Sequence, residues 1–425
     1  MKPRNRLGWA LLVVILITPR IQLIPVAGSF IRLEDVLFSV NFMWLIYNRH
    51  LLIAIPESQI KLFKILIAMS LAGLLSSIFA AVSERNSLVT GILFSLRPIE
   101  YATLIPTIYI LLNQSLKGIN VVLLILTLTT FVSSMLQTFL SLKIGTNRFG
   151  FSRSSALTGG PYELAMISVL LLIYWLKNSR ILLVCLCVIS LIASASRVSL
   201  LALGFGLILL SFGRFLKSEK PINRFPRNSL NLFKPFFLIT VIFVAVVSTS
   251  TSEKFIQVLA QYQSRIQNTE SSSLTLRESF LLAKSAPRIS SSHQYSEIVF
   301  LRPPDFTGGL ESTDASARRR YFVWFTLIKT FFDSKSFIWG LGPGFAGSAV
   351  DGNYIRIVAE YGLLGIVCYW KWFASLLRGS RFWFKSALAA VLVTGLYIDI
   401  FTSIKTSLIL YIFYMLSNRE KSHLF

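Results

Sequence analysis

Apolar runs long enough to cross a lipid bilayer recur from one end of this chain to the other. Crossing a bilayer takes roughly 20 helical residues, because only helices and closed barrels satisfy their backbone hydrogen bonds there. With 54% hydrophobic and 14% charged residues, the composition is unlike that of a soluble domain of this length. We therefore predict an all-α, polytopic transmembrane bundle of about twelve spans. The expected spans are 7–25, 33–48, 65–82, 88–112, 117–142, 161–176, 181–195, 198–213, 235–250, 353–374, 386–401 and 404–417.

The first residues combine a basic start with an apolar core, as a signal peptide does, and Val26-Ala27-Gly28 resembles a cleavage region. A second apolar run follows at once, and many more come after it. We therefore interpret the stretch as a retained first helix.

The long hydrophilic stretch between about 251 and 352 divides the chain into three parts. We predict spans one to nine in 1–250, a large extracytoplasmic loop with amphipathic helices in 251–352, and spans ten to twelve in 353–425. The aromatic segment from Arg320 to Phe332 is amphipathic, which favours a helix lying on the outer leaflet.

Basic residues in the short connections predict the orientation. Crossings that alternate as expected put one large group of them on the same side, and the positive-inside rule makes that side cytoplasmic. Both chain termini are then cytoplasmic. The group consists of Lys2, Arg4, Arg6, Arg49, Lys61, Lys64, Lys177, Arg180, Arg214, Lys217, Lys220, Arg224, Arg227, Lys234, Arg378, Arg381 and Lys385.

A second group of arginines is expected outside, against this rule. It comprises Arg20, Arg32, Arg85, Arg148, Arg153, Arg197, Arg318, Arg319, Arg320 and Arg356. Long external loops translocate whatever their charge, which explains the triple arginine but not the arginines in short connections. A polyanionic ligand is the simplest reason for the outward positive charge.

The chain has 3 Cys and 3 His, and the cysteines Cys185, Cys187 and Cys368 all lie in apolar runs. This pattern indicates neither a disulfide framework nor a zinc site. We expect no metal and no other cofactor, and the basic composition of a membrane chain gives no reason to expect nucleic acid.

The stretch from Trp339 to Gly365 contains the most unusual pattern. A loop rich in glycine leads directly into an apolar segment carrying Asn353, Arg356 and Glu360, which share one helix face, and the last two can pair at i, i+4. Gly362 and Gly365 mark a second face where another helix could approach closely. A helix with a polar first turn is the plainer interpretation, but ionisable groups in apolar spans are costly and usually functional.

Other polar groups have structural alternatives. Arg97 and Glu100 favour an internal pair, and Glu34 with Asp35 can be first-turn acids of the second span. Gly159-Gly160-Pro161 places a helix N-terminus on the outside, where anions bind. Arg197 can extend to the headgroups. Asp399 is expected to pack or to pair with Lys405.

These residues resemble the O-antigen ligase and O-antigen polymerase superfamily of bacterial surface-polysaccharide enzymes. The likeness lies in short motifs spread over most of the chain: Ile31 to Asp35, Arg148-Phe149-Gly150, Ser194 with Ser196-Arg197, Arg320 with Trp324, Gly340 to Gly344, and Asn353-Tyr354 with Glu360, Gly362 and Gly365. Ligases of this family commonly carry a His before the Asn-Tyr pair. Asp351-Gly352 stands there instead, which favours a polymerase.

The resemblance implies inverting, metal-independent glycosyl transfer at the outer face of the bacterial inner membrane, from an undecaprenyl-diphosphate-linked saccharide to a glycan acceptor. A flippase and a chain-length regulator are possible partners. Arginines can neutralise the departing diphosphate, and an acid can orient the attacking hydroxyl. The candidate catalytic residues are Asp351, Glu360, Arg197 and Arg320; the candidate substrate-binding residues are Arg32, Arg148, Asn353, Tyr354 and Arg356.

Two other functions remain open at the level of sequence. One is a glycosyltransferase that uses a lipid-monophosphate sugar, with Glu34 or Asp35 as base or holding a metal. The other is a transporter, either a flippase of lipid-linked saccharide or a carrier of a small anion. Transporters tend to have repeated halves and charges near the midplane, whereas the charges here gather toward one surface.

Overall fold

The computed structural model describes residues 3–19, 21–26, 29–140, 154–194, 196–216, 272–301, 315–347, 352–401 and 403–422. This part of the chain is mostly helical, as predicted, with one antiparallel hairpin of strands β1 (Gln22–Val26) and β2 (Ser29–Arg32). The expected ninth span, Arg148 and Asp351 lie outside the described residues, as do Arg20 and Arg153.

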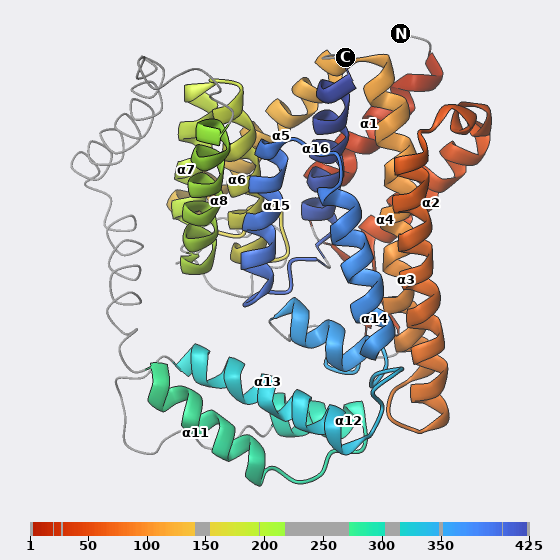
Figure 1. The fold of residues 1–425 in the computed structure, drawn as a ribbon, viewed down its shortest axis with the longest axis vertical. Helices are drawn as coiled ribbons and strands as arrows, with labels where there is room; N and C mark the ends of the chain where they lie inside the picture. Colours follow the sequence, from red (N-terminus) through yellow and green to blue (C-terminus); the bar gives the residue numbers. More distant parts are fainter. Residues whose placement is uncertain are drawn as a thin grey trace.

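Helices form where the apolar runs predict them (Figure 1). Three of them, namely α3, α4 and residues 116–139 of α5, are long and apolar enough to cross a membrane, and shorter apolar helices accompany them. The figure of about twelve spans remains a prediction. The helices of the bundle are α1 (Pro3–Ile17), α2 (Leu33–Tyr47), α3 (Glu57–Val82), α4 (Leu88–Gln114), α5 (Leu116–Leu140), α6 (Pro161–Lys177), α7 (Ile181–Ala193), α8 (Arg197–Leu216), α14 (Asn353–Leu377), α15 (Phe382–Gly395) and α16 (Ile404–Ser422).

The core of the bundle lies around α16 and α6. Every side chain of α16 from Leu408 to Leu416 is at most 2% exposed, and Figure 1 shows this helix surrounded by its neighbours. A helix that is apolar on all sides must be enclosed by other helices or by lipid. In α16, protein encloses it.

A second layer crosses one end of the bundle (Figure 1). It consists of α11 (Ser272–Ser285), α12 (Ser292–Ser296), the π-helix η2 (Glu297–Leu301) and α13 (Ala315–Asp333). Its small core includes Tyr295, Phe322, Leu327 and Phe345. The expected aromatic helix therefore exists as part of α13, and it packs on protein as well as presenting an outer face.

Both chain ends lie at the opposite end of the bundle, where α1 begins and α16 ends (Figure 1). Contacts tie basic residues to this end: the Lys177 ammonium lies 4.9 Å from the centre of the Trp383 ring, and Arg419 donates to the carbonyl of Leu112. The second arginine group, where it is described, lies toward the α11–α13 end. The assignment of each end to a compartment stays a prediction.

The α3–α4 hairpin extends past its neighbours toward the second layer (Figure 1). Glu100 lies close enough to Glu34 and Asp35, in the first turn of α2, to interact electrostatically with both. Helix α4 begins at Leu88, twelve residues before Glu100, so about 18 Å of helix lies beyond the start of α2. The charges in the middle of α4 are consequently level with the start of α2.

Candidate functional site

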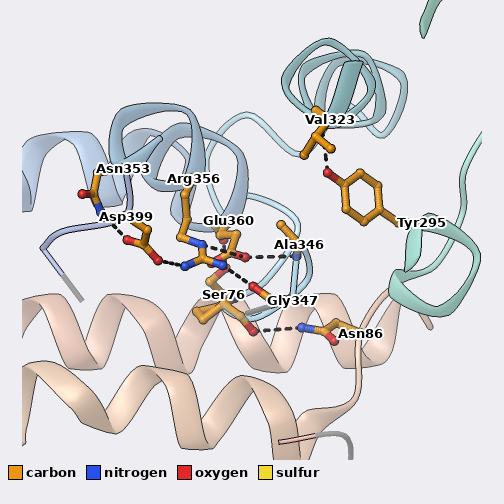
Figure 2. A network of polar contacts seen from close by, with 11 residues as sticks. Ser76, Asn86, Tyr295, Val323, Ala346, Gly347, Asn353, Arg356, Glu360 and Asp399 are labelled. Atoms are coloured by element: carbon orange, nitrogen blue, oxygen red, sulfur yellow. Dashed lines mark hydrogen bonds and ion pairs between the residues drawn. The ribbon is translucent and has the colours of Figure 1, made fainter. Parts of the chain in front are cut away.

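Helix α14 is bent at Gly362, where φ is +60° and ψ is −152°. Residues 353–361 form a short arm across the end of the bundle, and the rest of α14 runs along the bundle (Figure 1). The sequence predicted one uninterrupted span over 353–374, which is wrong in this respect. Asn353, Arg356 and Glu360 share the face of the arm that points toward Asp399 and α3 (Figure 2).

The loop 337–347 forms hydrogen bonds with backbone N–H and C=O groups that lack a helical partner at the bend. The N–H of Leu341 donates to the carbonyl of Ala359 at 2.7 Å, and the N–H of Leu363 donates to Phe337 at 2.9 Å. These contacts matter because an interrupted helix exposes unpaired N–H and C=O groups. The expectation that another helix approaches at Gly362 is wrong, since backbone atoms of this loop occupy that space.

Arg356 is the centre of the polar network in Figure 2. Its guanidinium forms an ion pair with Asp399 and donates to the carbonyl of Gly347, while Nε lies 3.6 Å from Oε1 of Glu360. The predicted i, i+4 pair is therefore confirmed. Arg356 is 5% exposed, so its charge is desolvated and depends on these acidic partners.

Asp399 joins the site from the segment after α15. It pairs with Arg356 and also accepts a hydrogen bond from the amide of Asn353. The expected pairing with Lys405 is wrong, because the Lys405 ammonium donates to the carbonyls of Thr18 and Leu157, each at 2.6 Å. Forty-three residues separate Asp399 from Arg356, so local spacing could not reveal the pair.

Asn353 and Tyr354 hold the chain that follows α15. The Asn353 side-chain oxygen accepts the N–H groups of Ile400 and Phe401, at 2.5 and 3.0 Å. The Tyr354 hydroxyl donates to the carbonyl of Leu392 at 3.0 Å. Both side chains, expected to contact sugar hydroxyls, make protein contacts here, and Asn353 is 1% exposed.

Glu360 fixes the glycine-rich loop beside it. Its Oε1 accepts the N–H of Ala346 at 3.0 Å, and its backbone oxygen accepts the Ser76 hydroxyl at 3.0 Å. At 1% exposure, the carboxyl group is enclosed by protein. As a candidate base it has no open approach in this arrangement, whereas its contacts suit a positioning role.

Arg320 lies on the face of α13 that turns toward the arm. It is half-buried and stands one turn before Trp324, whose ring would lie 3.1 Å from a Cβ on Gly352. Trp324 also faces Tyr397, with ring centres 6.3 Å apart. The structure therefore brings this turn of α13 next to Gly352, which directly precedes the arm.

Two further predicted arginines, Arg32 and Arg197, belong to described elements. Arg32 is buried and precedes α2, and its backbone N–H donates to Asp35 at 2.7 Å. This contact confirms Asp35 as a first-turn acid, and Arg32 interacts electrostatically with Glu100. Arg197 begins α8.

Arg85 has a structural role at the tip of the α3–α4 hairpin. It binds the hydroxyl of Ser336 and, at 3.0 Å, the carbonyl of Ser334. Burial, together with the positive charge of Arg288, lowers the pKa of Arg85. Nearby, burial raises the pKa of the Tyr295 phenol, and the Glu360 carboxylate adds to this effect. The hydroxyl therefore stays protonated and donates to the carbonyl of Val323 at 3.3 Å.

No protein-family model and no curated protein matches this chain. The site combines arginines with carboxylates and comes from α2, α4, α13, α14 and the segment after α15. Such a site suits binding and charge neutralisation of an anionic substrate at the end of a helical bundle.

Proposed function

We propose that this protein is a membrane glycosyltransferase that polymerises, or ligates, undecaprenyl-diphosphate-linked saccharide units at the outer face of the cytoplasmic membrane. The observation that carries the proposal is the convergence of arginines from distant parts of the sequence at one end of the bundle. Arg32 interacts with Glu100 of α4, and Arg356 pairs with Glu360, which also interacts with Arg97 of α4. Arg320 stands one turn before Trp324, which lies beside Gly352 at the start of α14. A diphosphate is the substrate group that such an arrangement fits best.

The reaction transfers the saccharide in a single displacement. The acceptor hydroxyl oxygen attacks the anomeric carbon as the bond to the diphosphate oxygen breaks, which inverts the configuration. Undecaprenyl diphosphate departs with the bonding electrons, and the hydroxyl proton passes to a base. Asp351 is our candidate for this base, because Glu360 is enclosed by its own protein contacts.

The arginines divide into two roles. Arg320, with Arg148 and Arg197, is assigned to the diphosphate, whose developing negative charge fixed guanidinium groups can stabilise without a metal. Arg356 is a positioning residue. Together with Asp399 and Glu360 it holds the arm and the loop on either side of Asp351.

The surroundings of the site favour an acceptor glycan at a membrane surface. Helix α13 is amphipathic and lies across the bundle end, where it can face the headgroup region. We place that end outside the bacterial inner membrane, and both termini in the cytoplasm, with a flippase and a chain-length regulator as partners. Asp351-Gly352, in place of the ligase His, favours polymerisation.

The use of Asp35 as a catalytic base, considered for a lipid-monophosphate donor, is less favoured. Asp35 Oδ2 accepts the backbone N–H of Arg32 at 2.7 Å and caps α2. A capping carboxylate stabilises a helix start and is already engaged.

Deleting the gene tests the proposal directly. We expect lipid-linked single repeat units to accumulate and the polymer to disappear, as measured by mass spectrometry of extracted lipids and by gel analysis of the polysaccharide. Polymer that accumulates on its lipid carrier would indicate a ligase. Unchanged lipid-linked intermediates and unchanged polymer would refute the assignment.

A further inference from the structure

Arg97 and Glu100, in the middle of α4, are not used by the site around Arg356. The sequence predicted that they form an internal ion pair. Among the described residues, neither side chain forms an ion pair, and the Arg97 guanidinium carbon instead lies 4.6 Å from the centre of the Phe94 ring. Glu100 has a buried carboxyl oxygen, Oε2, without a hydrogen-bond partner. Guanidinium and carboxyl groups that are withdrawn from water normally have a hydrogen-bond or ion-pair partner.

The neighbouring acids are already engaged. Asp35 accepts the N–H of Arg32, and Glu34 lies close enough to Lys405 to interact with its charge. Arg97 therefore keeps donors that no described acid uses. It also interacts electrostatically with Glu360 on the arm of α14, so the pair lies next to the site rather than apart from it.

The flanking side chains on α4 and α2 are apolar and exposed. Val89, Leu96, Arg97 and Glu100 fall within about one third of the helix circumference. Val89 is 46% and Leu96 37% exposed, and Val36, next to Asp35 on α2, is 44% exposed. Arg97 and Glu100 themselves are half-buried. Such a border between protein interior and exposed apolar surface suits contact with a lipid.

We propose that Arg97 and Glu100 form a binding subsite for a lipid-borne phosphate that carries a hydroxyl-bearing group. The forked guanidinium of Arg97 donates two N–H groups to phosphate oxygens. Glu100 accepts a hydrogen bond from a hydroxyl on the attached group. The inference rests on the proposed function only for the identity of the lipid, which would then be the undecaprenyl diphosphate carrier.

Native mass spectrometry of the full-length protein in detergent tests the subsite. The probes are undecaprenyl diphosphate, undecaprenol, which has no phosphate, and phosphatidylglycerol. We expect undecaprenyl diphosphate to bind and undecaprenol to bind at least about tenfold more weakly, as loss of a charged contact predicts. Comparable binding of both lipids, or no binding of either phosphate lipid, would overturn the proposal.

Variants locate the phosphate contact. Arg97→Gln should weaken binding of undecaprenyl diphosphate about tenfold, and Arg97→Lys, which keeps the charge but loses the fork, should weaken it less. Glu100→Gln should leave binding of the bare carrier within about twofold, because its partner is the attached group. Arg49→Gln, exposed near the end of α2 that lies away from the site, is the charge-matched control. Unchanged binding by both Arg97 variants would refute the proposed subsite.

The two sources of phosphate give different results. Preference for undecaprenyl diphosphate over phosphatidylglycerol assigns the subsite to the carrier, whereas equal binding, lost in Arg97→Gln, assigns it to bilayer phospholipid. The outcome is separable from that of the proposed function. If binding depends on Arg97 but deletion of the gene leaves the polymer intact, the subsite is supported and the polymerase is refuted. If Arg97→Gln changes neither polymer nor binding, the subsite is refuted and the polymerase is not.

Discussion

Gly340 and Gly362 interlock, and neither position has room for a side chain. A Cβ on Gly340 would lie 2.4 Å from the carbonyl oxygen of Glu360, and a Cβ on Gly362 would lie 2.6 Å from that of Ile338. Both glycines also have positive φ, at 77° and 60°. The bend in α14 and the loop 337–347 are therefore parts of one structure that holds the polar arm in place.

Gly362→Ala should lower the stability of the protein by more than about 2 kcal/mol, because strain at positive φ adds to overlap with backbone oxygens. Thermal unfolding in detergent, followed by intrinsic fluorescence, measures the change. Gly204→Ala in α8 is the control, since nothing lies within 4 Å of its Cβ position. We expect it to be neutral or slightly stabilising. Equal melting temperatures for Gly362→Ala and the unmodified protein would contradict the interlock.

Asp399→Ala should destabilise the protein by roughly 3 kcal/mol, because it leaves the buried Arg356 guanidinium without its carboxylate. Asp399 is partly exposed, so water offsets some of this cost. The double variant Arg356→Met with Asp399→Leu should be less destabilised than the sum of the single variants. A double-mutant cycle on thermal unfolding measures this coupling, and strict additivity would show that the pair contributes nothing.

Arg320→Ala and Arg197→Ala should each abolish polymer formation while the protein still inserts into the membrane. Lysine at either position should restore little activity if the guanidinium binds phosphate oxygens with two N–H groups. Polymer length on gels and the amount of protein in membrane fractions are the measurements. Arg319→Ala, at the exposed neighbouring position, is the matched control and should retain most of the polymer. Normal polymer in both test variants would refute the assignment of these two residues to the site.

Ser83→Cys and His50→Cys should react with a membrane-impermeant maleimide in opposite ways. Both positions are exposed, one at the tip of the α3–α4 hairpin and the other beyond α2. The assay uses cells with a permeabilised outer membrane and an intact inner membrane, and a protein without Cys185, Cys187 and Cys368. Ser83→Cys should be labelled and His50→Cys should not. Labelling of His50→Cys alone would reverse the proposed orientation.

The sequence predicts the local features of this fold well. Hydropathy locates the helices, since burial of apolar runs is their main driving force. The Asp35 cap and the Arg356–Glu360 pair follow from spacings of three and four residues, which place side chains together wherever a helix forms.

Features that depend on distant segments escape the sequence. The bend at Gly362 requires the loop around Gly340 to pair with its open backbone, and Asp399 meets Arg356 only through the packing of the segment after α15. Spacing also misleads at Arg97 and Glu100, because residues three apart on a helix can point toward one another or diverge to other partners. The positions of Arg148 and Asp351 lie outside the described residues and stay predictions.

The reach of the α3–α4 hairpin has a consequence for the geometry of any reaction at this end of the protein. Its tip binds α12 through the carbonyl of Arg85 and binds the loop 337–347 through Asn86. Ser76, which lies farther from the tip on α3, binds the arm. One pair of helices thus sets the distance between the second layer and the charges of Arg97 and Glu100 on α4. Removing one turn from both helices would bring that layer about 5.4 Å closer, and the space between the layer and these charges would shrink accordingly.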